Sequence, residues 1–229
     1  MNPDLFTKLD NPAWWALKGL QQAFAAGAPH IKRYRAGILP FAAFEQGTKD
    51  SLDALDAWLE QDEIFYMIGE LPSLPPHWEL VNELPCIQMI ARERMAVTGD
   101  SVPISLLTPE DDTELFNLVN KVQPGYYLPG THRLGNYFGI RQDDRLVAVA
   151  GERIRLEGLT EISAICTDPD YTGRQYAQHL IAHICNTCLD QGIAPFLHVL
   201  QTNQRAIRLY EYLGFRQRRG ITFRKLVKL

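Results

Sequence analysis

Residues 166–177, CTDPDYTGRQYA, join a predicted strand to a predicted helix through a short turn that contains proline, glycine and arginine. The apolar run LTEISAICT (residues 159–167) reads as the strand, and a helical pattern follows to about Asp190. The first N–H groups of a helix have no partner within it, and the helix dipole makes them attractive to phosphate oxygens. Gly173 and Arg174 suit such an anion site, although a turn of this composition is also common as a purely structural element.

A second segment, NQRAIRLYEYLGF (residues 203–215), predicts a short helix between two strands. Asn203 is a typical N-cap, and Gly214 lies where a helix ends. Tyr210 stands beside the apolar stripe of this helix.

Together the two segments resemble the coenzyme-binding core of the GNAT superfamily of acyl-CoA-dependent N-acyltransferases. ICTDPDYTGRQYAQHL is similar to the strand, turn and helix in which an Arg/Gln-x-x-Gly-x-Gly/Ala turn cradles the diphosphate. NQRAIRLYEYLGF is similar to the closing Asn…Ala…Leu-Tyr-Glu…Leu-Gly-Phe segment. Two positions depart from the pattern: Thr172 replaces the first Arg or Gln, and Gln175 replaces the first small residue.

The likeness is closest to the branch with glycine N-acyltransferase-type domains, where a Glu opens the coenzyme strand eight residues before the Pro. Glu161 stands in that relation to Pro169. NPAWWAL (residues 11–17) and RYRAGILPFAAFE (residues 33–45) also resemble the amino-terminal half of bacterial members. The resemblance covers most of the chain and is specific from about residue 137 onward.

The resemblance implies an α/β fold with a GNAT-like central mixed sheet flanked by helices. We expect an amino-terminal α/β region over residues 1–100, either a second layer or a degenerate second GNAT-like half. A GNAT domain is expected over residues 101–229. Acetyl-CoA or a related acyl-CoA would be the co-substrate, with no metal. The coenzyme contacts carried over are Ile165, Cys166, Thr167, Thr172, Gly173, Arg174, Gln175, Tyr176, Ala177 and Asn203.

Direct transfer of an acetyl or other short acyl group to a primary amine needs a base for the ammonium and an acid for the departing thiolate. Glu161 matches the base position, and burial would raise its pKa toward neutrality. Strand alternation places it with Ser163, Ile165 and Thr167, opposite Ile162, Ala164 and Cys166. Tyr210 matches the position of the acid, since a neutral phenol can protonate a thiolate.

Other interpretations stay open at this stage. Glu161 is equally compatible with a solvated strand end, and Tyr210 with a packing role. Cys166 could be a nucleophile in a ping-pong route, which the family seldom uses. The chain could also bind acyl-CoA without turnover, as a sensor or interaction module, or bind RNA through its basic end.

The acceptor is the least determined part of the prediction. The loop residues Tyr126, Tyr127, His132 and Arg133 are placed to line an acceptor site, and Arg133 could meet a substrate carboxylate. A small-molecule or peptide amine is the expected partner, bound by a monomer or homodimer.

Composition is that of an ordinary folded protein, with 46% apolar and 22% charged residues. The net charge of −4 disfavours a nucleic-acid or membrane partner. The beginning of the sequence lacks the pattern of a signal peptide, which predicts a cytoplasmic protein whose four cysteines are thiols. The alternating carboxy-terminal segment, with Ile221, Phe223 and Val227, predicts an edge strand with a charged outer face.

Overall fold

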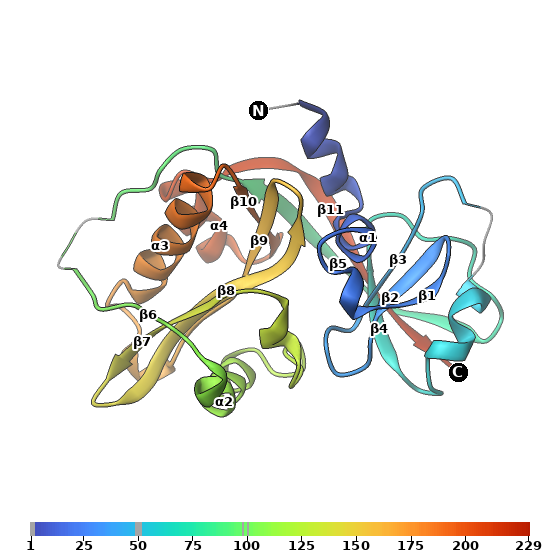
Figure 1. The fold of residues 1–229 in the computed structure, drawn as a ribbon, viewed down its shortest axis with the longest axis horizontal. Coiled ribbons are helices and arrows are strands. Elements are labelled where there is room, and N and C mark those ends of the chain that lie inside the picture. The colour runs from blue at the N-terminus through green and yellow to red at the C-terminus, as the bar shows by residue number, and fades with distance from the viewer. Residues whose placement is uncertain (1–2, 49–51, 98, 100) are drawn as a thin grey trace.

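The protein is described by a computed structural model that covers residues 3–48, 52–97, 99 and 101–229. One sheet of eleven strands runs through the molecule in the order β1-β2-β3-β4-β11-β5-β10-β9-β8-β7-β6 (Figure 1). The strands are β1 (Ala25–Ala28), β2 (Ile31–Tyr34), β3 (Phe41–Phe44), β4 (Ile64–Ile68), β5 (Trp78–Ile90), β6 (Ser105–Leu106), β7 (Tyr137–Gln142), β8 (Arg145–Leu156), β9 (Leu159–Thr167), β10 (Ala194–Leu200) and β11 (Arg216–Lys228).

Four α-helices and several short 3₁₀ turns cover this sheet. The α-helices are α1 (Pro12–Lys18), α2 (Asp112–Val122), α3 (Tyr176–Asp190) and α4 (Gln204–Tyr212). The 3₁₀ segments are η1 (Pro3–Asp10), η2 (Gln22–Phe24), η3 (Leu52–Trp58), η4 (Pro109–Asp111), η5 (Thr131–Leu134) and η6 (Pro169–Tyr171). The sheet is mixed, because β9 pairs with β10 and β3 with β4 in parallel while the other pairs are antiparallel. The predicted mixed sheet flanked by helices is confirmed.

The two helices α2 and α3 bury opposite faces of the strands β7 to β9. The apolar side chains of α2 pack on Tyr137 and Val149, whereas those of α3 pack on Ile140 and Val147. Because both faces are covered, the part of β8 between them, residues 146–151, is a continuous run without a polar side chain. The predicted strand over residues 159–167, the helix after it and the short helix over residues 203–215 are confirmed as β9, α3 and α4.

The prediction of a carboxy-terminal edge strand is wrong. β11 lies inside the sheet, where Phe223 is opposite Leu84 of β5 on one side and Ile68 of β4 on the other. The amino-terminal strands β4 to β1 continue the sheet beyond β11. They pair with the side of β11 that was expected to be a free edge. β5 in turn lies between β11 and β10, so one sheet contains strands from both sides of residue 100. A division into domains at that residue stays a prediction.

A bulge in β9 breaks the expected alternation of side chains. Ala164 has φ +50, and the register with β8 shifts between the pairs Val149–Cys166 and Gly151–Ser163. As a result Ile162 and Ile165 both pack in the cluster under α3, while Ala164 and Cys166 both face α2. The predicted grouping of Ile165 with Glu161 and Ser163 therefore fails, since a bulge moves every later side chain to the other face.

Just before the bulge, β9 and β10 separate. Their parallel pairing ends at Glu161 and Phe196, although β9 continues to Thr167 and β10 to Leu200. The diverging ends leave a gap between two neighbouring strands in the middle of the sheet. Backbone groups along this gap are available to a ligand.

Gly151 of β8 is required by the close approach of the Tyr137 ring. A Cβ atom at Gly151 would lie 2.3 Å from Cδ1 of that buried ring. We expect Gly151→Ala to lower the free energy of unfolding by about 1–3 kcal/mol through overpacking. Gly220→Ala is the matched control in β11, because its new Cβ would meet no atom closer than 3.6 Å. Denaturant titration of both variants tests this; equal stability of Gly151→Ala and the parent chain would contradict it.

Candidate active site

A cavity of about 480 Å³ opens where β9 and β10 diverge. Ser163 and Ala164 of β9 and Val199 and Leu200 of β10 line its side toward α4. Its walls are mainly aromatic, contributed by Phe41, Tyr66, Tyr126, Tyr127, Tyr137, Tyr210 and Phe223. Since Phe41 and Tyr66 come from β3 and β4, both sides of the sequence build this cavity. Its size suits a small molecule.

The turn before α3 has the geometry that an anion site needs. Gly173 has φ +80 with no atom within 4 Å of the position of a Cβ, so its backbone is open to approach. Gln175 has φ +60 and makes no side-chain capping bond to the helix. The first N–H groups of α3 thus lack a partner within the helix. The Thr172 hydroxyl donates to the carbonyl of Pro169 at 3.1 Å, and the Arg174 guanidinium lies 5.1 Å from the Tyr171 ring centroid.

The residues carried over as coenzyme contacts lie on β9, on this turn and at the starts of α3 and α4. Tyr176 is an exception in its orientation, because its side chain is buried in the cluster under α3. Asn203 caps α4, its Oδ1 accepting from the N–H of Ala206 at 3.1 Å, and it also lines the cavity. Both roles considered for Asn203 are therefore compatible with its position.

Asp168, which the sequence did not single out, holds the turn in place. Its buried carboxylate accepts from Lys121 at 3.0 Å and from Arg145 at 2.6 Å. The hydrogen bond from Lys121, the bond from the N–H of Asp170 and both positive charges lower its pKa. The sequence could have indicated this role, because an Asp directly before Pro169 at the end of a strand is typical of a residue that caps a turn.

Glu161 is fully buried, and its surroundings contradict the expected raised pKa. Oε2 accepts from Arg153 Nε at 2.8 Å, while Oε1 accepts from Arg153 Nη2 and from His198 Nδ1, each at 2.7 Å. Burial alone would raise the pKa of Glu161, but the charge and hydrogen bonds of Arg153 and the bond from His198 lower it to about 2. The carboxylate is neither a solvated strand end nor a group ready to accept a proton at neutral pH.

Glu161 belongs to a row of polar side chains that crosses five adjacent strands. The row runs from Arg218 (β11) through Gln88 (β5), His198 (β10) and Glu161 (β9) to Arg153 (β8). Gln88 Oε1 accepts from Arg218, so its amide nitrogen donates to His198 Nε2 at 2.9 Å. This assigns the neutral imidazole with its proton on Nδ1. His198 therefore has both ring nitrogens engaged.

Tyr210 lines the cavity as a neutral phenol. Burial raises its pKa to about 12, and its ring packs edge-on against Phe215 at 5.9 Å. Burial likewise raises the pKa of the nearby Cys166 thiol to about 12. A buried thiol of this kind is a poor nucleophile, which disfavours the ping-pong route.

The predicted acceptor residues divide into two groups. Tyr126 and Tyr127 line the cavity. His132 instead pairs with Asp112 at 3.2 Å, and Arg133 lies over the ring of Phe24 at 5.5 Å. Neither His132 nor Arg133 is among the residues that line the cavity, and the guanidinium that does line it belongs to Arg153.

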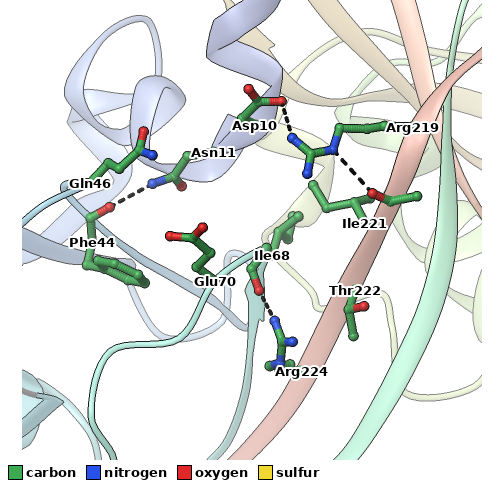
Figure 2. Close-up of a pocket in the computed structure, with 12 residues that line it drawn as sticks. Asp10, Asn11, Phe44, Gln46, Ile68, Glu70, Arg219, Ile221, Thr222 and Arg224 are labelled. Carbon is green, nitrogen blue, oxygen red and sulfur yellow. Dashed lines mark hydrogen bonds and ion pairs between the residues drawn. The ribbon is translucent and has the colours of Figure 1, made fainter.

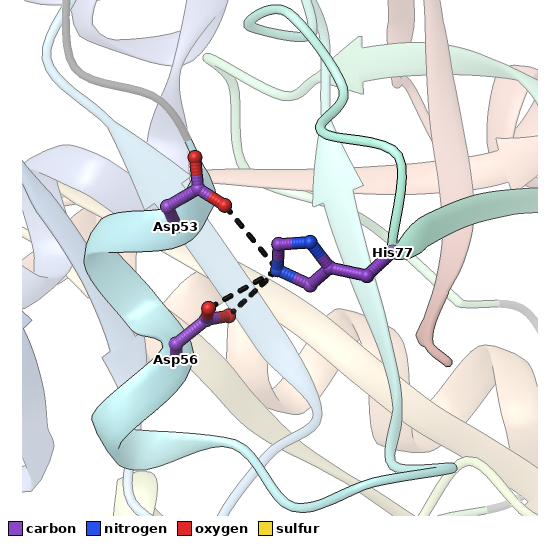
Figure 3. Close-up of side chains that lie close together, drawn as sticks. All are labelled: Asp53, Asp56 and His77. Carbon is purple, nitrogen blue, oxygen red and sulfur yellow. Dashed lines mark hydrogen bonds and ion pairs between the residues drawn. The ribbon is translucent and has the colours of Figure 1, made fainter.

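Two other polar regions of the described chain carry less chemistry. A pocket of about 300 Å³ lies between the end of β4 and β11, and two of its charges, Asp10 and Arg219, pair with each other at 2.8 Å (Figure 2). Asp53, Asp56 and His77 have metal-like spacing (Figure 3), but His77 Nε2 lies between the two carboxylates at 3.1–3.2 Å. Lys228 also approaches Asp56 at 3.5 Å, so the acidic charge is already partnered.

The four cysteines are buried thiols, as predicted. The Cys185–Cys188 pair faces the core under α3. Among the helices that the structure describes, none has the length and apolar character needed to cross a bilayer.

Comparison with known proteins agrees with this geometry. The family described as FR47-like protein matches residues 137–223, which include β7 to α4 and most of β11. The [Ribosomal protein bS18]-alanine N-acetyltransferases of Salmonella typhimurium and Escherichia coli are 34% identical over 76 residues and 32% identical over 81 residues. These alignments cover 33% and 35% of this chain and 51% and 54% of the relatives. The chain thus spans about half the length of the curated relatives it matches.

Solved structures extend the likeness to both halves of the sequence. A GCN5-related N-acetyltransferase from Kribbella flavida has the same fold, with a TM-score of 0.62, 16% identity and coverage of 94% of this chain and 93% of its own. A crystal structure from Novosphingobium aromaticivorans, assigned to the GNAT family, has a TM-score of 0.87 and 34% identity. That alignment covers 96% of this chain and 98% of the other. The chain therefore belongs to the GNAT family of N-acetyltransferases.

Proposed function

We propose that this protein transfers an acetyl or other short acyl group from acyl-CoA directly to a primary amine. The observation that carries the proposal is the cavity between the diverging β9 and β10, which Tyr210 lines. The open turn before α3 lies at the end of β9, on the same strand. A candidate phosphate site, the end of β9 and a candidate acid thus follow one another along the chain.

The chain's residues fit a bound acyl-CoA. The N–H groups after Gly173 and the charge of Arg174 would hold the diphosphate, and the edge of Ile165 to Thr167 that faces away from β8 would hold the pantetheine arm. When bound, the co-substrate supplies the acyl group as a thioester. Gln175 leaves the turn usable because its backbone, not its side chain, would face the phosphate. Its positive φ is nevertheless less favourable than it would be for glycine.

Tyr210 would donate its phenolic proton to the departing sulfur. Its pKa of about 12 keeps the hydroxyl protonated throughout the pH range in which amines are acylated. The coenzyme thiol, with an ordinary pKa of about 8.5, is a stronger acid than this phenol, so Tyr210 stabilises the developing thiolate through a hydrogen bond from its hydroxyl, and complete transfer of the proton to sulfur is not required.

Glu161 is excluded as the base by its low pKa, and we assign it the role of positioning Arg153 and His198. The acceptor would instead lose its proton to water. Burial in the cavity and the positive charge of Arg153 both disfavour an ammonium there and lower its pKa. The amine would thus bind in its neutral form.

The acceptor class extends from small amines to peptide amino groups. The curated relatives act on the alanine of a ribosomal protein, which brings a protein amino terminus within this class. The likeness to glycine N-acyltransferase-type domains, with Glu161 eight residues before Pro169, favours a small acceptor.

Acetyl-CoA binding is tested by its effect on the melting temperature. At one hundred times its dissociation constant the ligand should stabilise the chain by about 2.7 kcal/mol, a shift of several degrees. Gly173→Asp should abolish this shift by placing a negative charge at the phosphate site. Gly192→Asp is the matched control at the other end of α3, where φ is +73 and no atom lies within 4 Å of the Cβ position. Equal shifts in both variants would place the coenzyme elsewhere.

The acid role of Tyr210 is tested by Tyr210→Phe. We expect kcat to fall roughly 10- to 1,000-fold with little change in the affinity for acetyl-CoA, because only the proton donor is lost. Coenzyme-thiol release measures kcat, and the ligand-induced melting shift measures affinity. Tyr212→Phe on the same helix is the control, since that side chain is 68% exposed. Full activity of Tyr210→Phe would remove Tyr210 from the mechanism.

The protonation scheme makes a pH prediction. With Glu161 ionised down to a pKa of about 2, it contributes no break to the kcat/KM profile between pH 5 and 9. The rate should rise roughly tenfold per pH unit up to one break set by the acceptor amine. Profiles for two acceptors whose amine pKa values differ by at least one unit should therefore break at different pH. A break at the same pH for both would reveal a protein base.

A further inference from the structure

Two buried tyrosine hydroxyls in the cavity have no partner. Tyr127 and Tyr137 are only 4% and 3% exposed, and their rings meet edge-on with centroids 5.7 Å apart. Among the residues that the structure describes, neither hydroxyl makes a hydrogen bond of good geometry, although the two lie close enough for each to shift the pKa of the other. Buried polar groups are nearly always satisfied, and an exception beside a cavity points to a ligand. Burial raises the pKa of both phenols, so they are neutral and able to donate.

A third donor faces the same space. The Arg153 guanidinium uses Nε and Nη2 for Glu161, and no described residue bonds to its Nη1. The side chain keeps 16% of its surface exposed and lines the cavity with the two tyrosines. The two-point contact with Glu161 fixes the plane of the guanidinium, so the direction of the remaining N–H groups is set before any ligand binds.

The remaining walls at this end are apolar faces. Phe41 lies under the Arg153 guanidinium at 5.0 Å and packs edge-on against Phe223 and Tyr66. One cation therefore faces a space bounded by aromatic rings, and the two buried hydroxyls belong to tyrosines in its wall. This arrangement favours a ligand that has a hydrogen-bond-accepting oxygen next to an apolar group. It disfavours a ligand that carries a second positive charge.

We infer that Arg153, Tyr127 and Tyr137 bind the carbonyl or carboxylate oxygen of the acceptor. The acceptor would be an α-amino acid or α-amino amide with an apolar side chain, rather than a polyamine or a simple alkylamine. The inference rests on the proposed acyl transfer and names its acceptor class. The α-amine lies two bonds from the carbon that carries this oxygen, so recognition at Arg153 also orients the nitrogen.

The test compares leucine, leucinamide and 3-methylbutylamine, which share one side chain and differ in the oxygen-bearing group. Coenzyme-thiol release, with kcat/KM expressed per neutral amine so that the different amine pKa values cancel, should be at least roughly tenfold higher for leucine or leucinamide than for 3-methylbutylamine. Leucine and leucinamide separate carboxylate from carbonyl recognition. Calorimetric titration of the same compounds, with coenzyme A present, measures binding independently of turnover.

Tyr127→Phe and Tyr137→Phe should each raise KM for the preferred compound roughly tenfold and leave 3-methylbutylamine unaffected. Their melting temperatures should equal or exceed that of the parent chain, because the lost hydroxyl had no partner. Arg153→Lys keeps the charge beside Glu161 but removes the fixed N–H groups, and should abolish the preference. Arg133→Gln, outside the cavity, is the control that retains it.

Two results overturn the inference while leaving acyl transfer intact. One is 3-methylbutylamine reacting as well as both oxygen-bearing compounds. The other is a Tyr→Phe variant that melts lower and loses activity equally toward all three. Absence of thiol release with every amine, despite acetyl-CoA binding, overturns the transferase proposal and this inference together. Calorimetric binding of leucine or leucinamide in that case would show a sensor that uses the same residues.

Discussion

The buried ion pair between Arg153 and Glu161 is the constraint on which the rest of the active site depends. Removing one partner of such a pair typically costs about 3–5 kcal/mol, because the other charge is left uncompensated. The pair joins β8 to β9 just before the bulge, and His198 connects it to β10. It therefore fixes the three strands at the point where β9 and β10 begin to separate, and it sets the plane of the guanidinium that faces the cavity.

This constraint is held from the amino-terminal side as well. Tyr34 donates to Gln21 Oε1 at 2.6 Å, and Gln21 Nε2 donates to the carbonyl of Arg153 at 2.7 Å. Gln88 and Arg218 support His198 from β5 and β11. The first hundred residues thus supply two aromatic residues of the cavity wall, Phe41 and Tyr66, together with polar contacts behind its charged group. An amino-terminal region in this position forms one side of the cavity that we propose for the acceptor.

Local signals in the sequence were sufficient for much of this architecture. The turn at Gly173, the helix after it and the cap at Asn203 follow from neighbouring residues, and each was predicted. The bulge was not, because Ala164 is an ordinary residue that only its strand pairing forces to a positive φ. The pKa of Glu161 was predicted with the wrong sign for a related reason. Burial was foreseeable, whereas Arg153 and His198 reach Glu161 only through strand pairing.

The interior position of β11 has a consequence for synthesis on the ribosome. β5 ends at Ile90, yet its two neighbours are β10, which begins at Ala194, and β11. This strand therefore emerges about a hundred residues before anything can pair with either edge. Unpaired strands of this length are prone to associate with other chains during slow, non-local folding. The nascent chain has to keep β5 protected until the last strand enters the middle of the sheet.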